Sequence, residues 1–244
     1  DLGIEIGGHV IQIGSVGYES WGQVREIADG LSSKGAETIY KKADLSEVRC
    51  LNEDLSDRMR EEIKMRRKEG TSLGGIYEII VTGLPAGLGS YVHWDRKLDG
   101  QLAQAIVSTQ AMKGVEIGLG FEAGKTHGHE VHDEIIYEDD TFQRRSNRAG
   151  GIEGGMTPGM PIILRGVMKP IPTMLKPLKT ADIETKIEQE TRYERSDVCA
   201  LPRAVVVVES VIAPVLANAI LEKFGGDSMK EVLERFPLNN GRKK

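Results

Sequence analysis

Glycine is the residue type that most restricts how this chain can fold. The 244 residues include 29 glycines, about 12 % against a usual ~7 %, and five of them fall between 150 and 159. Glycine is used where φ must be positive or where backbone approaches another group closely. Arg144, Arg145 and Arg148 precede the 150–159 segment. That segment is either a set of tight turns beside a sheet or backbone that meets an anion or a flat ring.

Hydrophobic periodicity predicts alternating strands and helices. Strands are expected where β-branched residues gather: at 4–13, broken around Gly7-Gly8, and at 76–82, 114–118 and 161–168. Helices are expected at 53–69, 97–109, 202–224 and 229–236. Gly70 should end the first helix, Pro214 should kink the third, and Asp227-Ser228 should cap the last. Residues 15–50 are expected to be an irregular excursion or a small lobe, and 123–149 a polar loop. No strand–Gly-x-Gly-x-x-Gly–helix unit of a dinucleotide fold is present.

Charge and composition exclude several classes of protein. Lys and Arg number 32 against 37 Asp and Glu, a net charge of -5, so there is no basic excess for nucleic acid. The longest apolar runs, 204–208 and 211–217, fall short of the roughly 20 residues of a membrane span. Two cysteines cannot form a disulfide framework, which favours a reducing cytoplasmic location. The chain opens Asp1-Leu2-Gly3-Ile4, so we expect it to be the interior of a longer polypeptide.

Three histidines within six residues form the first candidate site. His127, His129 and His132 lie beside carboxylates and could bind zinc or iron. Their order is not the i, i+4 pairing of a helical zinc site, and in a strand His132 would face away from the other two. A polar loop of hydrogen-bonded histidines is the favoured interpretation, so no metal site is predicted. A metal-dependent hydrolase that uses the three histidines is the minor alternative.

Two later segments carry further candidate ligand groups. In the Lys-Pro-Ile-Pro-Thr segment at 169–173, prolines hold a lysine and a threonine in place. This suits a phosphate or a ring carbonyl, or simply the exit from an edge strand. In an extended 194–197 segment, Arg195 and Asp197 would point the same way. They form either a guanidinium that binds an anion beside a carboxylate that handles a proton, or an ordinary surface ion pair.

Several segments, taken together and in this order, resemble the later two-thirds of chorismate synthase. They include Gly-Leu-Gly-Ser-Tyr-Val-His-Trp-Asp-Arg-Lys-Leu-Asp at 87–99 and the segments at 3–6, 113–118, 130–135, 147–155, 169–173 and 194–197. The resemblance runs through nearly the whole chain. It implies an α+β fold, a layered β-α-β sandwich with antiparallel sheets around a helical layer. Residues 1–244 would be a single domain, the C-terminal portion of that fold, with 237–244 as a flexible tail.

The resemblance implies an enzyme of aromatic amino acid biosynthesis in the shikimate pathway, located in the cytoplasm or in plastids. Such a lyase converts 5-enolpyruvylshikimate 3-phosphate to chorismate and phosphate by 1,4-anti elimination. The family requires reduced FMN, although no net redox change occurs, and the flavin is reduced by an external or NADPH-linked reductase activity. Its members are usually homotetramers. Neither a nucleic-acid partner nor a membrane is implied.

The family's site residues are carried over position by position. Flavin-contacting positions match Gln110, Ala111, Gly154, Lys169, Pro170, Ile171, Pro172, Thr173 and Arg195. The aspartate that handles a proton at the flavin matches Asp197, the one catalytic residue expected in this chain. These roles agree with the chemistry of the segments, which combine close backbone approach, cationic anchors and a carboxylate where protonation changes.

Other parts of the family pattern have no match in these 244 residues. They are the early Gly-Glu-Ser-His-Gly segment with its catalytic histidine, a second catalytic histidine, an arginine-rich substrate stretch and an Arg-Ser-Ser stretch. A phosphate and two carboxylates need several cationic partners, and this chain supplies only some. The sequence therefore predicts that the chain alone does not turn over substrate. The alternative function is a non-catalytic fragment that binds FMN or assembles with other chains.

Overall fold

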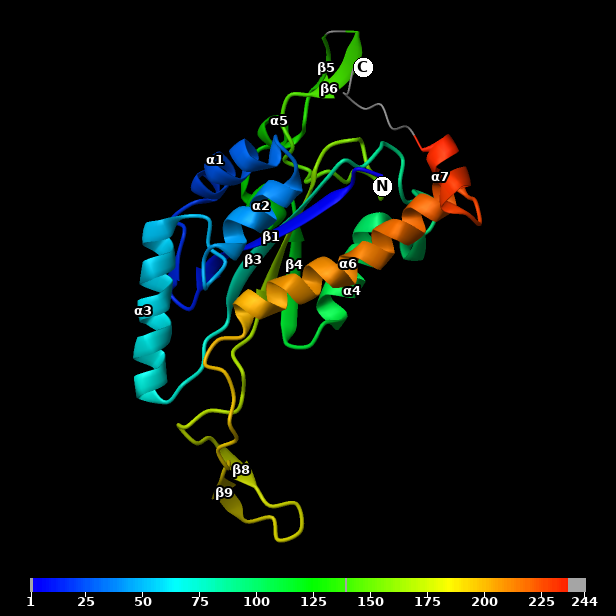
Figure 1. Cartoon of the computed structure of the whole chain (residues 1–244). Helices are drawn as coiled ribbons and strands as arrows, with labels where there is room; N and C mark the ends of the chain where they lie inside the picture. The colour runs from blue at the N-terminus through cyan, green and yellow to red at the C-terminus, as the bar shows by residue number, and fades with distance from the viewer. Residues whose placement is uncertain (1, 139, 237–244) are drawn as a thin grey trace.

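The computed structural model describes residues 2–138 and 140–236 (Figure 1). The strands in this part of the chain are β1 (Glu5–Ile13), β2 (Val16–Gly17), β3 (Gly75–Thr82), β4 (Met112–Ile117), β5 (Ile135–Glu138), β6 (Thr141–Arg144), β7 (Ile162–Met168), β8 (Lys179–Ala181) and β9 (Glu188–Glu190). The α-helices are α1 (Trp21–Ser32), α2 (Ala36–Asp44), α3 (Glu53–Glu69), α4 (Leu98–Ser108), α5 (Gly128–Val131), α6 (Leu201–Phe224) and α7 (Met229–Arg235). The 3-10 helices are η1 (Trp94–Arg96) and η2 (Gly120–Lys125). The tail predicted at 237–244 lies outside the described residues.

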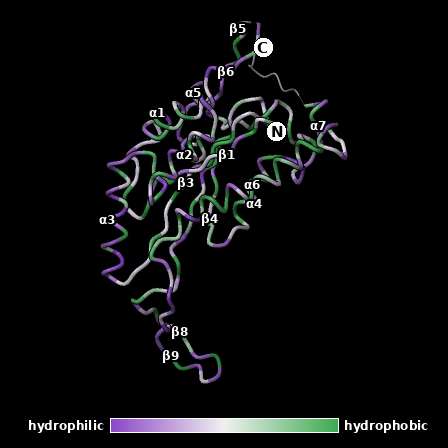
Figure 2. Tube along the Cα trace, viewed as in Figure 1, coloured by the Kyte–Doolittle hydropathy of each residue, from purple (hydrophilic) through white to green (hydrophobic). Residues whose placement is uncertain are grey.

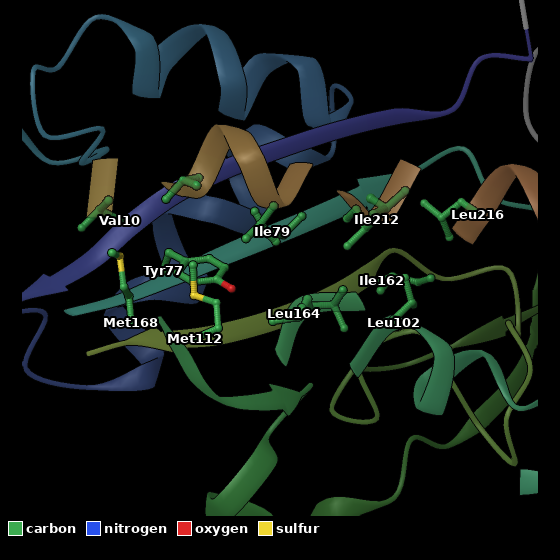
Figure 3. Close-up of a cluster of buried hydrophobic side chains, with 14 of the residues drawn as sticks. Val10, Tyr77, Ile79, Leu102, Met112, Ile162, Leu164, Met168, Ile212 and Leu216 are labelled. Carbon is green, nitrogen blue, oxygen red and sulfur yellow. The ribbon is translucent and has the colours of Figure 1, made fainter. Parts of the chain in front are cut away.

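Five strands form one antiparallel sheet in the order β2-β1-β3-β7-β4. Side chains of β3 alternate between its two faces. Tyr77 and Ile79 join the larger core cluster under α4 and α6, whereas Ile80 joins a smaller cluster with Ala36 and Ile39 of α2. Figure 3 shows part of the larger cluster, in which α6 lies over the sheet. The predicted α+β class, with antiparallel strands and a helical layer, is confirmed, and this sheet has helices on both faces.

Two adjacent glycines allow helices to pack on both faces of β1. A Cβ atom on Gly7 would collide with the carbonyl oxygen of Ala36 at the start of α2. A Cβ atom on Gly8, which faces the opposite way, would lie 2.5 Å from Val205 Cγ1 and 2.8 Å from Glu209 Oε1 of α6. The break expected at Gly7-Gly8 is wrong, because β1 runs through both residues and its only register shift lies between Val10 and Gln12.

Two buried charges cover the open edge of β1 beside Gly8. Glu209 Oε1 accepts a hydrogen bond from Gly8 N at 2.6 Å, and Arg49 Nη2 donates to Gly8 O at 3.2 Å. Arg49 Nη2 also pairs with Glu209 Oε1 at 3.3 Å, and Val10 N donates to Arg49 O at 2.9 Å. Burial raises the pKa of Glu209, and the charge of Arg49 opposes that rise. The edge is therefore paired inside the chain rather than left as a template for another strand.

The helices with clear start and stop signals are found where they were predicted. The 53–69 helix is α3, with Asn52 Oδ1 accepting from Leu55 N and Gly70 ending it at a φ of 75°. The predictions at 97–109, 202–224 and 229–236 correspond to α4, α6 and α7. Ser228 caps α7, as expected. Pro214 lies inside α6, which continues through it to Phe224.

Two segments predicted to be irregular contain regular structure. Within 15–50, α1 buries Val24 and Ala28 and α2 buries Ile39. These helices are short, and glycines lie inside α1 (Gly22, Gly30) and at the start of α2 (Gly35), where the sequence favours turns. Within 123–149, β5 and β6 form a hairpin whose side chains are mostly exposed, so burial imposes no alternation on the sequence.

Helix α6 is long and apolar enough to span a membrane by length and composition alone. The two apolar runs in the sequence are each too short to predict such a helix, because Glu209 and Ser210 separate them. In the structure, α6 packs along β1 and β3 and buries Val205, Ile212 and Leu216 in the core. The helix thus serves as the central core helix of this sheet.

A buried polar pair joins β1 to β3 on the α1–α2 side. His9 Nε2 lies 3.1 Å from Glu78 Oε1, directly across the ladder, and Arg25 from α1 also pairs with Glu78. Both His9 and Glu78 have no exposed surface. Burial, together with the nearby charge of Arg25, lowers the pKa of His9 to about 3, so the imidazole is neutral in the folded protein at pH 7.

Replacing Gly8 with alanine should destabilise the fold, because the added methyl group has no room between β1 and α6. We expect Gly8→Ala to lower the free energy of unfolding by about 1–3 kcal/mol. Gly30→Ala is the control, since a Cβ atom added at Gly30 in α1 would meet nothing within 4 Å, and it should raise that free energy by about 0.5–1 kcal/mol. Urea unfolding measures both. Equal effects would contradict the close packing described for β1.

Acid should destabilise the protein partly through His9. The unfolded chain binds a proton at this histidine below about pH 6.5, whereas the folded chain does so only near pH 3. The stability that His9 contributes is therefore complete above pH 6.5 and falls by up to about 1.4 kcal/mol per pH unit below it. Between pH 6.5 and pH 4.5, we expect the free energy of unfolding of the wild type to fall by more than that of His9→Gln. His93→Gln, at an exposed histidine, should show no such trend.

Candidate functional site

The end of the sheet at which β7 stops brings together three loops that are distant in the sequence. Residues 70–74 lead into β3, residues 169–175 leave β7, and residues 193–199 lead into α6. Leu73 N donates to Val198 O at 2.7 Å, which ties the first loop to the third. The three loops therefore form one hydrogen-bonded unit.

The 169–173 segment is held in this unit by serine hydroxyls from both neighbouring loops. Ser72 Oγ donates to Ile171 O, and Ser196 Oγ donates to Thr173 O at 2.7 Å. The two prolines of the segment have no N–H group to donate, so its carbonyl groups carry these contacts. The sequence-based interpretation of the segment as rigidly mounted is consistent with this arrangement.

The turn between α4 and β4 places Gln110 and Ala111 beside the start of the same segment. Ala111 adopts a positive φ of 69°, and its carbonyl oxygen accepts a hydrogen bond from Lys169 N at 3.0 Å. The side chains of Gln110 and Lys169 are both exposed. A residue other than glycine at positive φ costs backbone energy, so the turn is maintained by its surroundings.

A cavity of about 300 Å³ lies between the end of α3 and the three loops. Its charged lining residues are Arg67, Arg195 and Asp197. Its other lining residues include Tyr193 and the hydroxyl-bearing Thr71, Ser72, Thr173 and Ser196. Two of the predicted site residues with charged side chains, Arg195 and Asp197, are thus brought to one cavity.

Asp197 forms an ion pair with the first turn of α6. Its Oδ2 atom accepts a hydrogen bond from Arg203 Nη1 at 2.5 Å. Both side chains are substantially exposed, so the pair contributes at most ~1 kcal/mol to stability. Its consequence for the site is that Arg203 orients the carboxylate at the rim of the cavity.

Gly154 is the predicted site residue that the structure separates from the others. It is exposed at a φ of 61°, and no atom lies within 4 Å of its Cβ position. The next residue, Gly155, accepts a hydrogen bond from Leu98 N at the start of α4. Lys169 follows the far end of β7, whose seven residues span roughly 20 Å. Within one chain, Gly154 and the 169–173 segment therefore lie at opposite ends of the sheet.

The arginines before the glycine-rich segment are used to hold loops together. Arg144 Nη2 pairs with Glu153 Oε2 at 2.7 Å, and Arg145 Nη1 pairs with Glu134 Oε2 at 2.6 Å. Arg148 donates from its guanidinium to the carbonyl oxygen of a residue in α5. These contacts favour the structural interpretation of this segment.

The histidine cluster does not form a metal centre in the part of the chain that the structure describes. His127, His129 and His132 are all exposed, and the rings of the first two stack with their centroids 6.0 Å apart. No group of three potential metal-binding side chains gathers anywhere in the described residues. The arrangement gives no support to the metal-hydrolase alternative.

Sequence reasoning misses three residues of this region. The pattern of charges places Arg67 on the solvated face of a helix, and it gives Tyr193 and Arg203 no role. One signal for Arg67 is its position three residues before the helix-ending Gly70, because a side chain in the last turn lies close to the loop that follows the helix. Arg203 also has a signal in the sequence. It lies six residues after Asp197, in the first turn of the predicted helix, where its side chain can reach back to the preceding loop.

Comparison with known proteins gives a consistent result. The family model described as chorismate synthase matches residues 1–221. A chorismate synthase of Bacillus licheniformis is 50 % identical over 234 residues, covering 96 % of this chain and 57 % of the relative. One from Geobacillus kaustophilus is 52 % identical over 239 residues, covering 96 % of this chain and 59 % of the relative.

A solved structure agrees with the sequence relatives. The crystal structure of a chorismate synthase superimposes with a TM-score of 0.79 at 40 % identity, covering 96 % of this chain and 62 % of the other. The chain thus spans less than two-thirds of the length of the proteins that it matches. On the family match, the sequence identity and the shared fold together, this chain belongs to the chorismate synthase family.

Proposed function

We propose that this chain forms the cofactor side of a chorismate synthase, the lyase that converts 5-enolpyruvylshikimate 3-phosphate to chorismate and phosphate by 1,4-anti elimination. The observation that carries the proposal is the meeting of matched site positions at one end of the sheet. Ala111, the 169–173 segment, Arg195 and Asp197 come from separate parts of the chain. Hydrogen bonds from Lys169 and Ser196 connect them.

The residues at this end fit reduced FMN by their chemistry. Lys169 and Arg195 are exposed cations, suited to an anionic ligand. The prolines of the 169–173 segment give a rigid, donor-poor surface suited to a flat ring. When bound, reduced FMN would supply electron density as phosphate leaves. Asp197, oriented by Arg203, would be the group of this chain that accepts or returns a proton.

Assembly of several copies is part of the proposal. A flavin placed against the 169–173 segment would be roughly 20 Å from Gly154 of the same chain, the span of β7. In a homotetramer, another copy could bring its Gly154 to that flavin. Sedimentation of the protein should then give a mass well above the 26.8 kDa of one chain. A monomer would leave Gly154 without a role at the flavin.

The biological setting follows from the same proposal. The reaction belongs to aromatic amino acid biosynthesis, and the net charge and cysteine content suit the cytoplasm. Reduction of the flavin would come from an external or NADPH-linked reductase. The second candidate function is a non-catalytic fragment that binds FMN or assembles with other chains. It is favoured by the placement of Gly154 and the 169–173 segment at opposite ends of the sheet, because one copy does not bring all matched site positions together.

Removing the Arg195 guanidinium should weaken flavin binding by this chain. We expect Arg195→Ala to raise the Kd for reduced FMN by roughly tenfold or more, the loss of one charge-assisted hydrogen bond. Arg192→Ala is the control, because Arg192 is exposed directly before the same loop but does not line the cavity. Anaerobic titration followed by flavin fluorescence measures both. Equal affinities in the two variants would count against the flavin site proposed here.

The 244-residue chain should form no chorismate above background with reduced FMN and substrate. The physical reason is the small number of cations that it offers to a phosphate and two carboxylates. The full-length Bacillus licheniformis relative serves as the active control in the same steady-state assay. Turnover by this chain at the rate of that control would leave the fragment alternative, and the predicted inactivity, without support.

A further inference from the structure

The last turn of α3 places a cation in the cavity wall. Figure 2 shows that α3 is largely hydrophilic, as expected for a helix with a solvated face. Three of its six basic residues form ion pairs within the helix or with a nearby loop. Arg66, for example, pairs with Glu62 and Glu69. Its neighbour Arg67 instead lines the cavity, and it has no ion-pair partner among residues 2–138 and 140–236.

The end of α3 does not need this cation to satisfy its backbone. The carbonyl oxygen of Arg67 accepts a hydrogen bond from Gly70 N at 3.2 Å, and that of Arg66 accepts from Thr71 N at 3.1 Å. These main-chain contacts occupy the carbonyl groups that a basic side chain often caps. The guanidinium of Arg67 is therefore not needed to cap the helix and is available to bind a ligand in the cavity.

The charges that line the cavity sum to an excess of positive charge. Arg67 and Arg195 contribute two guanidinium groups, and within the described part of the chain neither is paired with a carboxylate. Asp197, the one acidic lining residue, is paired with Arg203, which lies outside the lining. Two guanidinium groups without carboxylate partners at one small cavity are suited to a dianionic ligand, which each can bind through two N–H groups.

We propose that Arg67 and Arg195 form a phosphate subsite, with Arg67 as a ligand-binding residue contributed by α3. The proposal rests on the proposed function for its biological ligand, which is the phosphate monoester of either the flavin or the substrate. Tyr193, also in the lining, belongs to the same loop as Arg195. The subsite itself requires only a phosphate dianion.

Inorganic phosphate tests the subsite directly, without flavin or substrate. The wild-type chain is titrated with phosphate in chloride buffer, and binding is followed by phosphorus NMR. Arg67→Ala and Arg195→Ala should each weaken phosphate binding by roughly tenfold or more. Lys68→Ala is the matched control, because Lys68 is exposed one residue further along the same turn and does not line the cavity. It should bind phosphate like the wild type.

Two results would overturn the subsite. One is a wild-type chain that binds no phosphate at millimolar concentration. The other is an Arg67→Ala variant that binds it as well as Lys68→Ala does. Because Arg67 is exposed and outside the core, both variants should keep the thermal midpoint of the wild type, which separates a lost contact from a lost fold.

Titrations with FMN and riboflavin identify the source of the phosphate. If Arg67→Ala weakens FMN binding but leaves riboflavin binding unchanged, the subsite holds the flavin phosphate. If it weakens inorganic phosphate binding and leaves FMN unchanged, the subsite holds the phosphate of the substrate. Failure of the proposed function gives a different pattern, in which no flavin binds while phosphate binding still depends on Arg67.

Discussion

The close contact of β1 with helices on both of its faces is the constraint on which the rest of this structure depends. Gly7 admits the start of α2 and Gly8 admits α6, so a single strand is the meeting point of the two core clusters. Side chains at these positions would push one helix away from the sheet. The buried pair of Arg49 and Glu209 can reach the backbone of Gly8 only because α6 lies so close. The close packing of α6 on β1 therefore also brings Glu209 to the open edge of that strand.

The sheet that results sets the geometry of the candidate site. Strands β3 and β7 pair in register, so the loop before β3 and the loop after β7 meet at one end. Helix α6 begins at that same end and contributes Arg203 to Asp197. The core thereby fixes the positions of the three loops, of which 169–175 and 193–199 bury little surface of their own. The length of β7 likewise fixes the distance of Gly154 from those loops.

Much of the fold could be predicted from sequence wherever a local signal was strong. The 53–69 helix had a capping asparagine, a periodic apolar face and a terminal glycine, and its ends were found as predicted. Helices α1 and α2 were missed, because Gly22 and Gly30 inside α1 and Gly35 at the start of α2 resemble turn residues in the sequence. The pairing of Arg49 with Glu209 joins residues 160 positions apart. No local pattern reports such a contact.

For the site, resemblance to a family assigned residues that local chemistry left open. The geometry brings Arg195 and Asp197 to one cavity with Arg67, which neither spacing nor composition could establish. Arg67 was overlooked because its position on a charged helix looks the same in sequence whether it faces solvent or a cavity. Tertiary placement of α3 against the third loop makes the difference.

Beyond the cavity, the chain between Thr173 and Tyr193 leaves the body as a hairpin in which β8 pairs with β9 (Figure 1). Leu178 and Thr191 exchange hydrogen bonds of 2.9 and 2.8 Å near its base. The outgoing leg carries Thr173 and the returning leg carries Arg195. Ser196 Oγ, on the returning leg, donates a hydrogen bond to Thr173 O at 2.7 Å, so the two legs stay close together where they leave the body. The ladder of a hairpin remote from the core therefore helps to hold together the second and third loops, which both line the cavity.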